Sequence, residues 1–139
     1  MTGYSGTPLP KKLGIKAGHR VLLVNPPAGL ALEPLPPEVE VVVGSDRNDP
    51  AADPYDVILS CCSDRAALAA VFDGLRARMR VTGGLWLGWP KKTSGVPTDL
   101  TETEVREFGL AAGLVDNKVC AIDETWSGLR FVIRVAHRR

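Results

Sequence analysis

Val21-Leu22-Leu23-Val24-Asn25-Pro26-Pro27-Ala28-Gly29-Leu30 is the stretch that decides the fold of this chain. Its four apolar residues predict a buried strand, and the following Asn-Pro-Pro predicts a sharp turn. A turn that binds phosphate between a strand and a helix uses glycines, whose backbone approaches the ligand and donates N–H groups to it. Proline has no N–H and a fixed φ, so those donors are missing. The stretch therefore predicts an α/β sheet whose first turn is not built for phosphate.

Length and composition indicate one globular domain. The 139 residues are 45% hydrophobic and 24% charged, and 17 Lys and Arg against 16 Asp and Glu give a net charge of +1. Because positive charge is not in excess, we expect neither a nucleic-acid nor a membrane partner. No apolar run reaches the length of a membrane span, and residues 1–16 lack the apolar core of a signal peptide. We therefore expect a cytoplasmic protein.

The three cysteines do not indicate a disulfide framework. Cys61 and Cys62 are adjacent, so their side chains point to opposite faces of a strand, and Cys120 stands alone. The histidines, His19 and His137, lie near the two ends of the chain. We expect buried thiols, no metal site and no catalytic residue.

The pattern along the chain predicts strands alternating with helices. Residues 1–14 are rich in Gly, Pro, Ser and Lys and indicate an extended N-terminal arm, followed by one domain over residues 15–139. The predicted strands span about residues 19–24, 39–43, 56–61, 85–89, 114–122 and 129–135. The predicted helices are a short one within residues 28–37, limited by Pro34, Pro36 and Pro37, one over residues 64–80 capped by Ser63, and one that opens on the capping box Thr101–Glu104 and ends at Gly113.

This order of elements resembles the class I S-adenosylmethionine-dependent methyltransferases. The similar segments are Lys16–Leu22, Val42–Asp46, Asp56–Ser60, Gly83–Trp89 and Ala112–Leu114 with the hairpin after it. The resemblance implies a three-layer, Rossmann-like α/β domain with a mostly parallel sheet of about six strands ending in an antiparallel hairpin. It also implies S-adenosylmethionine as cofactor and Asp46 as the acid that holds its ribose. Between Gly44 and Asp56 the chain is too short for the family's third strand and its helices, so it resembles a trimmed methyltransferase.

A second resemblance covers nearly the whole chain. Tyr4–Ile15, Trp89–Gly95 and Trp126–Arg130 are similar to the small bacterial family catalogued as domain of unknown function 3052. That family has no assigned activity. The resemblance therefore implies the trimmed Rossmann-like fold and no catalytic residue.

Candidate ligand-binding residues gather where parallel strands end, at the carboxyl edge of the expected sheet. They are Asn25, Asp46, Ser63, Lys91, Lys92, Ser94 and Thr101. Ammonium groups, hydroxyls and a helix N-terminus would together form a pocket for a phosphate or a carboxylate. The alternative is a solvated loop whose lysines keep the edge soluble, and acids at Asp99 and Glu102 favour it.

The tryptophans give a second set of expectations. Trp86 and Trp89 are three residues apart in a predicted strand and should face opposite sides of the sheet. Trp126, at the hairpin, and Arg130 near it form a candidate interaction site, because a large ring at an exposed turn needs a contact. That contact is a partner or the body of the protein itself.

Three hypotheses of function stay open. We favour a non-catalytic binding or protein-interaction module on a degenerate methyltransferase-like scaffold, because Asn25-Pro26-Pro27 replaces the glycine-rich turn. One alternative is a methyltransferase with an atypical cofactor loop, completed by a dimer partner and using S-adenosylmethionine, the one cofactor considered. The other is a binder of a small anion or phosphometabolite at residues 91–101. The expected partners are accordingly an unidentified protein, a second copy of the chain, or a small anion.

Overall fold

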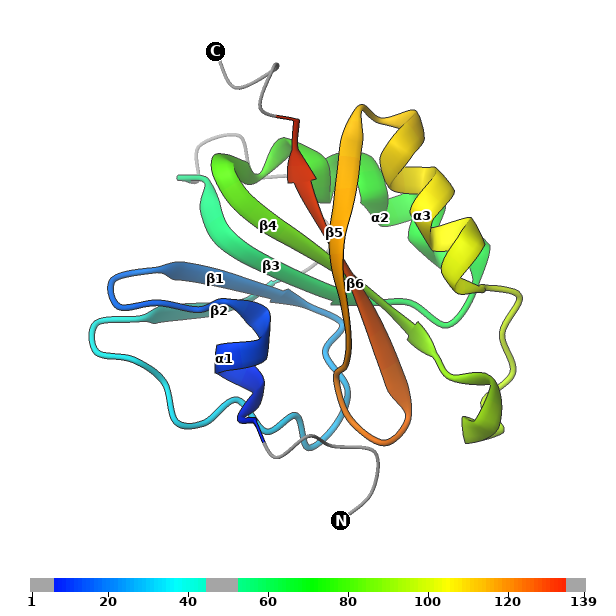
Figure 1. The fold of residues 1–139 in the computed structure, drawn as a ribbon, viewed down its shortest axis with the longest axis horizontal. Coiled ribbons are helices and arrows are strands. Elements are labelled where there is room, and N and C mark those ends of the chain that lie inside the picture. Colours follow the sequence, from blue (N-terminus) through cyan, green and yellow to red (C-terminus); the bar gives the residue numbers. More distant parts are fainter. Residues whose placement is uncertain (1–6, 45–52, 135–139) are drawn as a thin grey trace.

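A six-stranded sheet with helices on both faces forms the body of the protein (Figure 1). The computed structural model describes residues 7–44 and 53–134. The strands are β1 (Arg20–Val24), β2 (Glu40–Gly44), β3 (Tyr55–Cys61), β4 (Met79–Pro90), β5 (Leu114–Ala121) and β6 (Trp126–Ile133). The helices are α1 (Leu9–Leu13), α2 (Arg65–Ala77) and α3 (Glu102–Ala111), and a short 3₁₀ helix, η1, spans Lys92–Ser94.

The strand order is β2-β1-β3-β4-β6-β5. The first four strands of the chain run parallel to one another, whereas β6 is antiparallel to both β4 and β5. The sequence-based expectation of a mostly parallel, Rossmann-like sheet that ends in an antiparallel hairpin is therefore confirmed.

Each face of the sheet packs its own hydrophobic core. Alternate residues of β1 point to opposite faces, so Leu22 and Val24 join the core under α2 and α3, while Val21 and Leu23 join the core under α1. This double burial explains why the parallel strands are continuously apolar. The three-layer arrangement follows from it.

Trp86 and Trp89 lie on opposite faces, as expected. Trp86 is fully buried in the core under α1, and Trp89 is buried in the core under the other two helices. The indole Nε1 of Trp86 donates a hydrogen bond of 3.1 Å to the backbone carbonyl of Leu13 at the end of α1. The two tryptophans therefore contribute to both cores from one strand.

The expected extended arm is wrong for residues 9–13, which form α1. Leu9 and Leu13 are four residues apart and both are buried, so one turn of helix places both side chains on the sheet. Pro10 lies in the first turn, where its missing N–H costs nothing, and Gly14 ends the helix with φ 80°. The expected short helix within residues 28–37 is also wrong, because this proline-rich crossover contains no helix.

Two element boundaries differ from the sequence-based expectation. α2 ends at Ala77, and β4 begins at Met79, six residues before the expected Leu85. The early start passes through Gly83, where an added Cβ would lie 2.8 Å from the Asp56 carbonyl oxygen of β3. Similarly, β6 begins at Trp126 and not at Leu129, so the turn is shorter than predicted.

The contact between α3 and β6 yields a stability prediction. A Cβ added to Gly109 would lie 2.0 Å from the ring of Phe131. We expect Gly109→Ala to lower the free energy of unfolding by about 1–3 kcal/mol through overpacking, although alanine favours an isolated helix by about 1 kcal/mol. Urea denaturation measures the change. Combining it with Phe131→Leu should cost less than the sum of the single variants, and a stabilising Gly109→Ala would contradict the close approach.

Candidate carboxyl-edge site

The parallel strands β1, β3 and β4 end at one edge of the sheet. Val24 is in register with Ser60, and Cys61 with Gly88, so the residues that follow these strands lie side by side. The chain leaves β1 toward β2 on one side, while β3 lies on the other side. Open α/β sheets bind ligands at such a change of direction. Asn25 after β1 and Ser63 after β3 flank this point.

Asn25 forms the turn after β1. Its φ is 53°, a left-handed conformation that asparagine adopts more readily than most side chains. Pro26 and Pro27 follow without N–H groups, and the Leu30 N–H donates to the Pro27 carbonyl at 3.3 Å. The turn therefore contains a backbone hydrogen bond of its own. Its first two positions after Asn25 have no N–H to donate to a ligand.

The thiols at the end of β3 are held neutral. Burial raises the pKa of the Cys61 thiol far above its usual range, and the charges of Cys62 and Asp123 add to the shift. Burial also raises the pKa of Cys62, against a hydrogen bond with the hydroxyl of fully buried Ser60 that favours the thiolate. His19 is not placed to act as their base, because it lies before β1, at the opposite edge of the sheet. Its Nδ1 accepts the Lys16 N–H there. Their burial and raised pKa values are typical of structural thiols.

Asp64, and not Ser63, caps α2. The Asp64 carboxylate accepts the Ala67 N–H at 2.8 Å, which corrects the expected cap by one residue. Asp99, from the loop before α3, accepts the Arg65 N–H at 2.7 Å. Two carboxylates of the chain thus already occupy the N-terminus of α2, where an anion would otherwise bind. Both residue types cap helices well, so the sequence left the choice between Ser63 and its neighbour open.

The hydroxyls expected in the 91–101 loop bind backbone groups of the loop itself. The Ser94 hydroxyl donates to the Lys91 carbonyl at 2.6 Å and accepts the Val96 N–H at 3.2 Å. Thr101 accepts the Glu104 N–H at 3.3 Å and caps α3. The Glu104 carboxylate forms an ion pair with Arg65, so one half of the expected capping box links α3 to α2. Lys92, at the start of η1, is exposed.

The structure brings Lys91 and Trp126 together. Pro90 is in register with Trp126, and the Lys91 N–H donates to the Thr125 carbonyl at 2.8 Å. The Trp126 ring is half-buried and packs against the core under α1. The core under α1 therefore supplies part of the contact that we expected for the Trp126 ring.

Arg130 lies away from these two residues. It is in register with Trp86, and its guanidinium is 3.4 Å from the Asn117 side-chain oxygen. A Cβ added to Gly84 would lie 2.5 Å from its Nε atom, so the side chain covers that glycine. Four residues of strand, about 13 Å, separate it from Trp126. Asp46, the remaining predicted site residue, lies outside the described residues.

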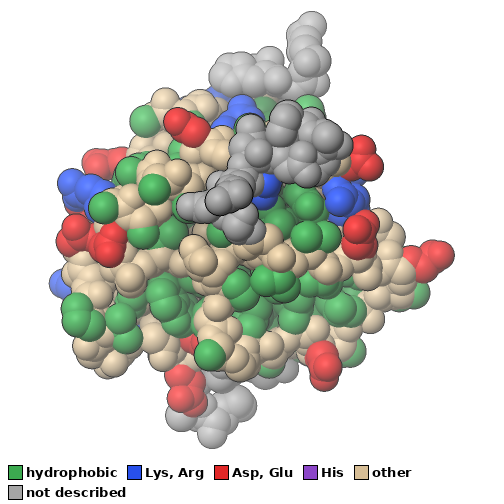
Figure 2. Space-filling model, turned by 180° about the vertical axis from the view of Figure 1, so that it is seen from behind, with side chains coloured by type: hydrophobic (Ala, Val, Ile, Leu, Met, Phe, Trp, Pro, Cys, Tyr) green, Lys and Arg blue, Asp and Glu red, His purple; other side chains and the backbone are tan. Residues whose placement is uncertain are grey.

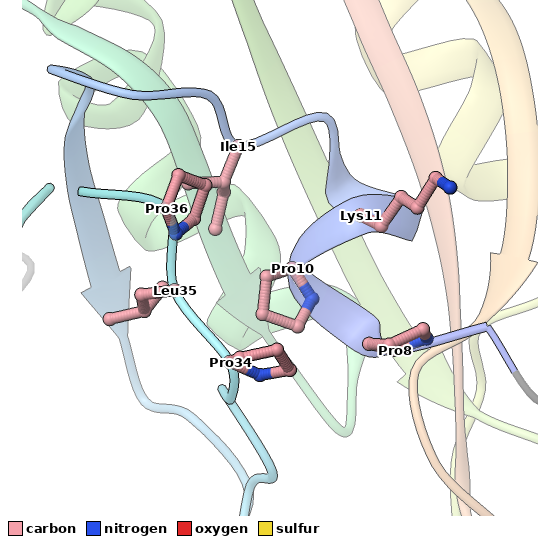
Figure 3. A pocket seen from close by; sticks show the side chains of 7 residues that line it. All are labelled: Pro8, Pro10, Lys11, Ile15, Pro34, Leu35 and Pro36. Carbon is pink, nitrogen blue, oxygen red and sulfur yellow. The ribbon is translucent and has the colours of Figure 1, made fainter.

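Sequence reasoning missed an apolar groove on the face that carries α1. Pro8 and Pro10 of the α1 region lie across it from the crossover between β1 and β2, whereas the Lys11 side chain extends away from the crossover (Figure 3). The groove has a volume of about 350 Å³. Its lining also includes Ile15, Pro34, Leu35 and Pro36. The signal was present as two proline-dense stretches, but only the fold shows that they meet.

Charged side chains of both signs are neighbours on the opposite side of the molecule. In Figure 2, Lys and Arg lie beside Asp and Glu around the rim, and hydrophobic side chains form a band across the lower half. Arg106 pairs with Glu102 at 2.6 Å and with Asp116 at 3.0 Å. Residues 7–44 and 53–134 contain no group of three or more His, Cys, Asp or Glu side chains that could hold a metal. None of the helices among them is long and apolar enough to cross a membrane.

Several methyltransferases are among the solved structures with a similar fold. One from Aquifex aeolicus is 17% identical with a TM-score of 0.64, covering 89% of this chain and 87% of its own. The precorrin-6y C5,15-methyltransferase of Geobacter metallireducens is 12% identical with a TM-score of 0.62, covering 91% and 86%. Fibrillarin from Aeropyrum pernix, solved with natively bound S-adenosyl-L-methionine, is 15% identical with a TM-score of 0.55, covering 94% and 71%.

Comparison by sequence finds no match. No protein-family model matches the chain, and no curated protein matches it. At these identities the structural likeness shows the fold alone, which is a trimmed, methyltransferase-like Rossmann fold.

The cap of α2 can be tested with two adjacent variants. We expect Asp64→Ala to lower the free energy of unfolding by about 1 kcal/mol, because the Ala67 N–H loses its acceptor. Ser63→Ala is the matched control and should change it by less than about 0.5 kcal/mol. Urea denaturation of the two proteins measures both values. The reverse ranking would restore Ser63 as the cap.

The thiol environments predict an order of alkylation. With iodoacetamide at neutral pH, we expect Cys120 to react first, because it is half-buried whereas the other two thiols are buried. Burial also raises the pKa of Cys120, although Lys12 and Lys118 oppose the shift, so its reaction should be slow. Peptide mass spectrometry after timed labelling gives the order, with the urea-unfolded chain as control. Rapid native labelling of Cys61 would contradict the burial of that thiol.

Proposed function

We propose that this chain is a small S-adenosylmethionine-dependent methyltransferase whose cofactor binds at the carboxyl edge between β1 and β3. The observation that carries the proposal is the topology: the strand order β2-β1-β3-β4-β6-β5, with its antiparallel end, places a change of chain direction between β1 and β3. Ligands of open α/β sheets bind at this position. The fold shared with the solved methyltransferases supports the same position.

The turn after β1 suits this cofactor better than a dinucleotide. A dinucleotide requires N–H donors for its pyrophosphate, which Pro26 and Pro27 do not have. S-adenosylmethionine contains no phosphate, and a sulfonium and an ammonium accompany its single carboxylate. In the proposed complex the Asn25 side chain would border the cofactor, and Asp46, which lies outside the described residues, would accept hydrogen bonds from the ribose hydroxyls. Pro26 and Pro27 therefore disfavour a dinucleotide more strongly than they disfavour S-adenosylmethionine.

The residues at this edge position the reactants. When bound, the cofactor would supply an electrophilic methyl group to an acceptor substrate, and its sulfonium would leave as the neutral thioether S-adenosylhomocysteine. The neutral thiols of Cys61 and Cys62 do not compete as nucleophiles, because burial raises the pKa of both. Rate enhancement in the proposed enzyme thus comes from proximity and orientation of the two substrates.

A non-catalytic binding module is the second candidate function. The observation that favours it is the crossover after Asn25-Pro26-Pro27, which contains no helix and so removes the N-terminal turn that usually faces the ligand. On this alternative the sheet is a scaffold and the edge binds no cofactor. The two candidates predict opposite results in one binding experiment.

Isothermal titration calorimetry with S-adenosylmethionine tests the proposal. We expect saturable binding to the full chain, and at least about a tenfold loss of affinity in Asp46→Ala, since a hydrogen bond to a charged acceptor contributes about 1.5–3 kcal/mol. Asp73→Ala, at an exposed position of α2, is the matched control and should bind like the original protein. No heat at millimolar cofactor would reject the enzyme and leave the binding module.

A further inference from the structure

The outer side of β2 carries backbone groups with which no strand of residues 7–44 and 53–134 pairs. The Glu40 N–H donates to the His19 carbonyl at 3.0 Å, so the backbone N–H and C=O of Glu40, Val42 and Gly44 face β1. Because successive residues of a strand alternate, those of Val41 and Val43 point away from the sheet. β2 is the outermost strand on this side, and no other strand among the described residues pairs with it (Figure 1).

The two edges of the sheet differ in their protection against pairing. β5, at the far edge, has a register shift between Asp116 and Lys118 and exposes the Lys118 side chain. Bulges and edge lysines are the means by which natural sheets prevent strand addition. β2 has neither, because its centre is Val41-Val42-Val43, and Val43 is 68% exposed. An unprotected β-branched edge favours pairing with another strand.

We propose that β2 pairs antiparallel with β2 of a second copy of the chain, which joins two sheets into one across a two-fold axis. With Val42 on the axis, Val41 of each copy lies opposite Val43 of the other. These are the residues whose N–H and C=O groups point outward, so each opposed pair exchanges two hydrogen bonds. The interface therefore has four backbone hydrogen bonds, and all the outward groups of Val41 and Val43 are used.

Charge and side-chain chemistry favour a second copy over an unrelated strand. In this register Glu40 lies opposite Gly44, so the two Glu40 side chains are kept apart. Val41 and Val43 form an apolar cross-strand pair on the face of α1, which covers the exposed Val43 side chain. The strand is thus complementary to itself in hydrogen bonding, charge and side-chain type.

The dimer is independent of the proposed methyltransferase function. Antiparallel pairing of β2 points the carboxyl edges of the two sheets in opposite directions. Each copy then keeps its own site between β1 and β3 open. Cofactor binding and dimer formation can therefore fail separately.

Sedimentation equilibrium of the full chain over micromolar to millimolar concentrations tests the dimer. We expect a concentration-dependent monomer–dimer equilibrium. Val43→Lys should raise the dissociation constant at least about tenfold, because it places a lysine on each side of the axis. Val119→Lys, at a 52% exposed position of the opposite edge strand, is the matched control and should leave the constant unchanged.

Val43→Pro tests the backbone hydrogen bonds separately from charge. It removes an N–H that points away from β1, so β2 stays in the sheet while two of the four proposed intermolecular bonds are lost. Circular dichroism checks that each variant folds; if the proline variant does not, the lysine variant decides. A chain that stays monomeric at every concentration overturns the proposal, as does a dimer that survives Val43→Lys or dissociates equally in Val119→Lys. Calorimetry with S-adenosylmethionine on the same samples reports the cofactor site independently.

Discussion

The packing of Trp86 is the interaction on which the rest of the structure depends. Its indole lies in the middle of β4 and extends over Gly128 of β6, where an added Cβ would be 3.2 Å from the ring. The same ring donates its N–H to the Leu13 carbonyl and so fixes the end of α1. A buried indole N–H without an acceptor would be costly. Together with the Ile122 side chain, 2.8 Å from the same added Cβ, Trp86 thus favours a glycine on the neighbouring strand, and it also fixes a helix end above it.

α1 explains how the sheet remains covered without a crossover helix. Between β1 and β2 a parallel sheet normally has a helix, because both of its faces are apolar. Here the crossover contains prolines and packs Leu30 and Leu32 against the core, while Leu9 and Leu13 of α1 cover the rest. A short helix from before β1 therefore takes part of the place of one from after it. The crossover without a helix and α1 together cover this face of the sheet.

The sequence predicted the strands better than the segments between them. β1, β2 and β3 have continuous apolar or β-branched patterns that depend only on burial, and the structure confirms them within a residue or so. α1 was missed because only Leu9 and Leu13 show helical spacing, and they lie in a proline-rich stretch. The burial of these leucines depends on packing with Trp86, which is far away in the sequence. The local pattern does not decide between Ser63 and Asp64, because both residue types cap helices well. It also did not show that β6 begins at Trp126, which places Arg130 four strand residues away.

The carboxyl edge lacks both of the usual ways to hold a phosphate. Pro26 and Pro27 remove N–H donors after β1, and the carboxylates of Asp64 and Asp99 already accept N–H groups at the start of α2. An incoming phosphate would have to displace these acids and would meet their charge at short range. A ligand with a positive centre meets no such cost at the same place. The carboxylates at the start of α2 therefore disfavour an anion at that point and are compatible with the sulfonium of the proposed cofactor.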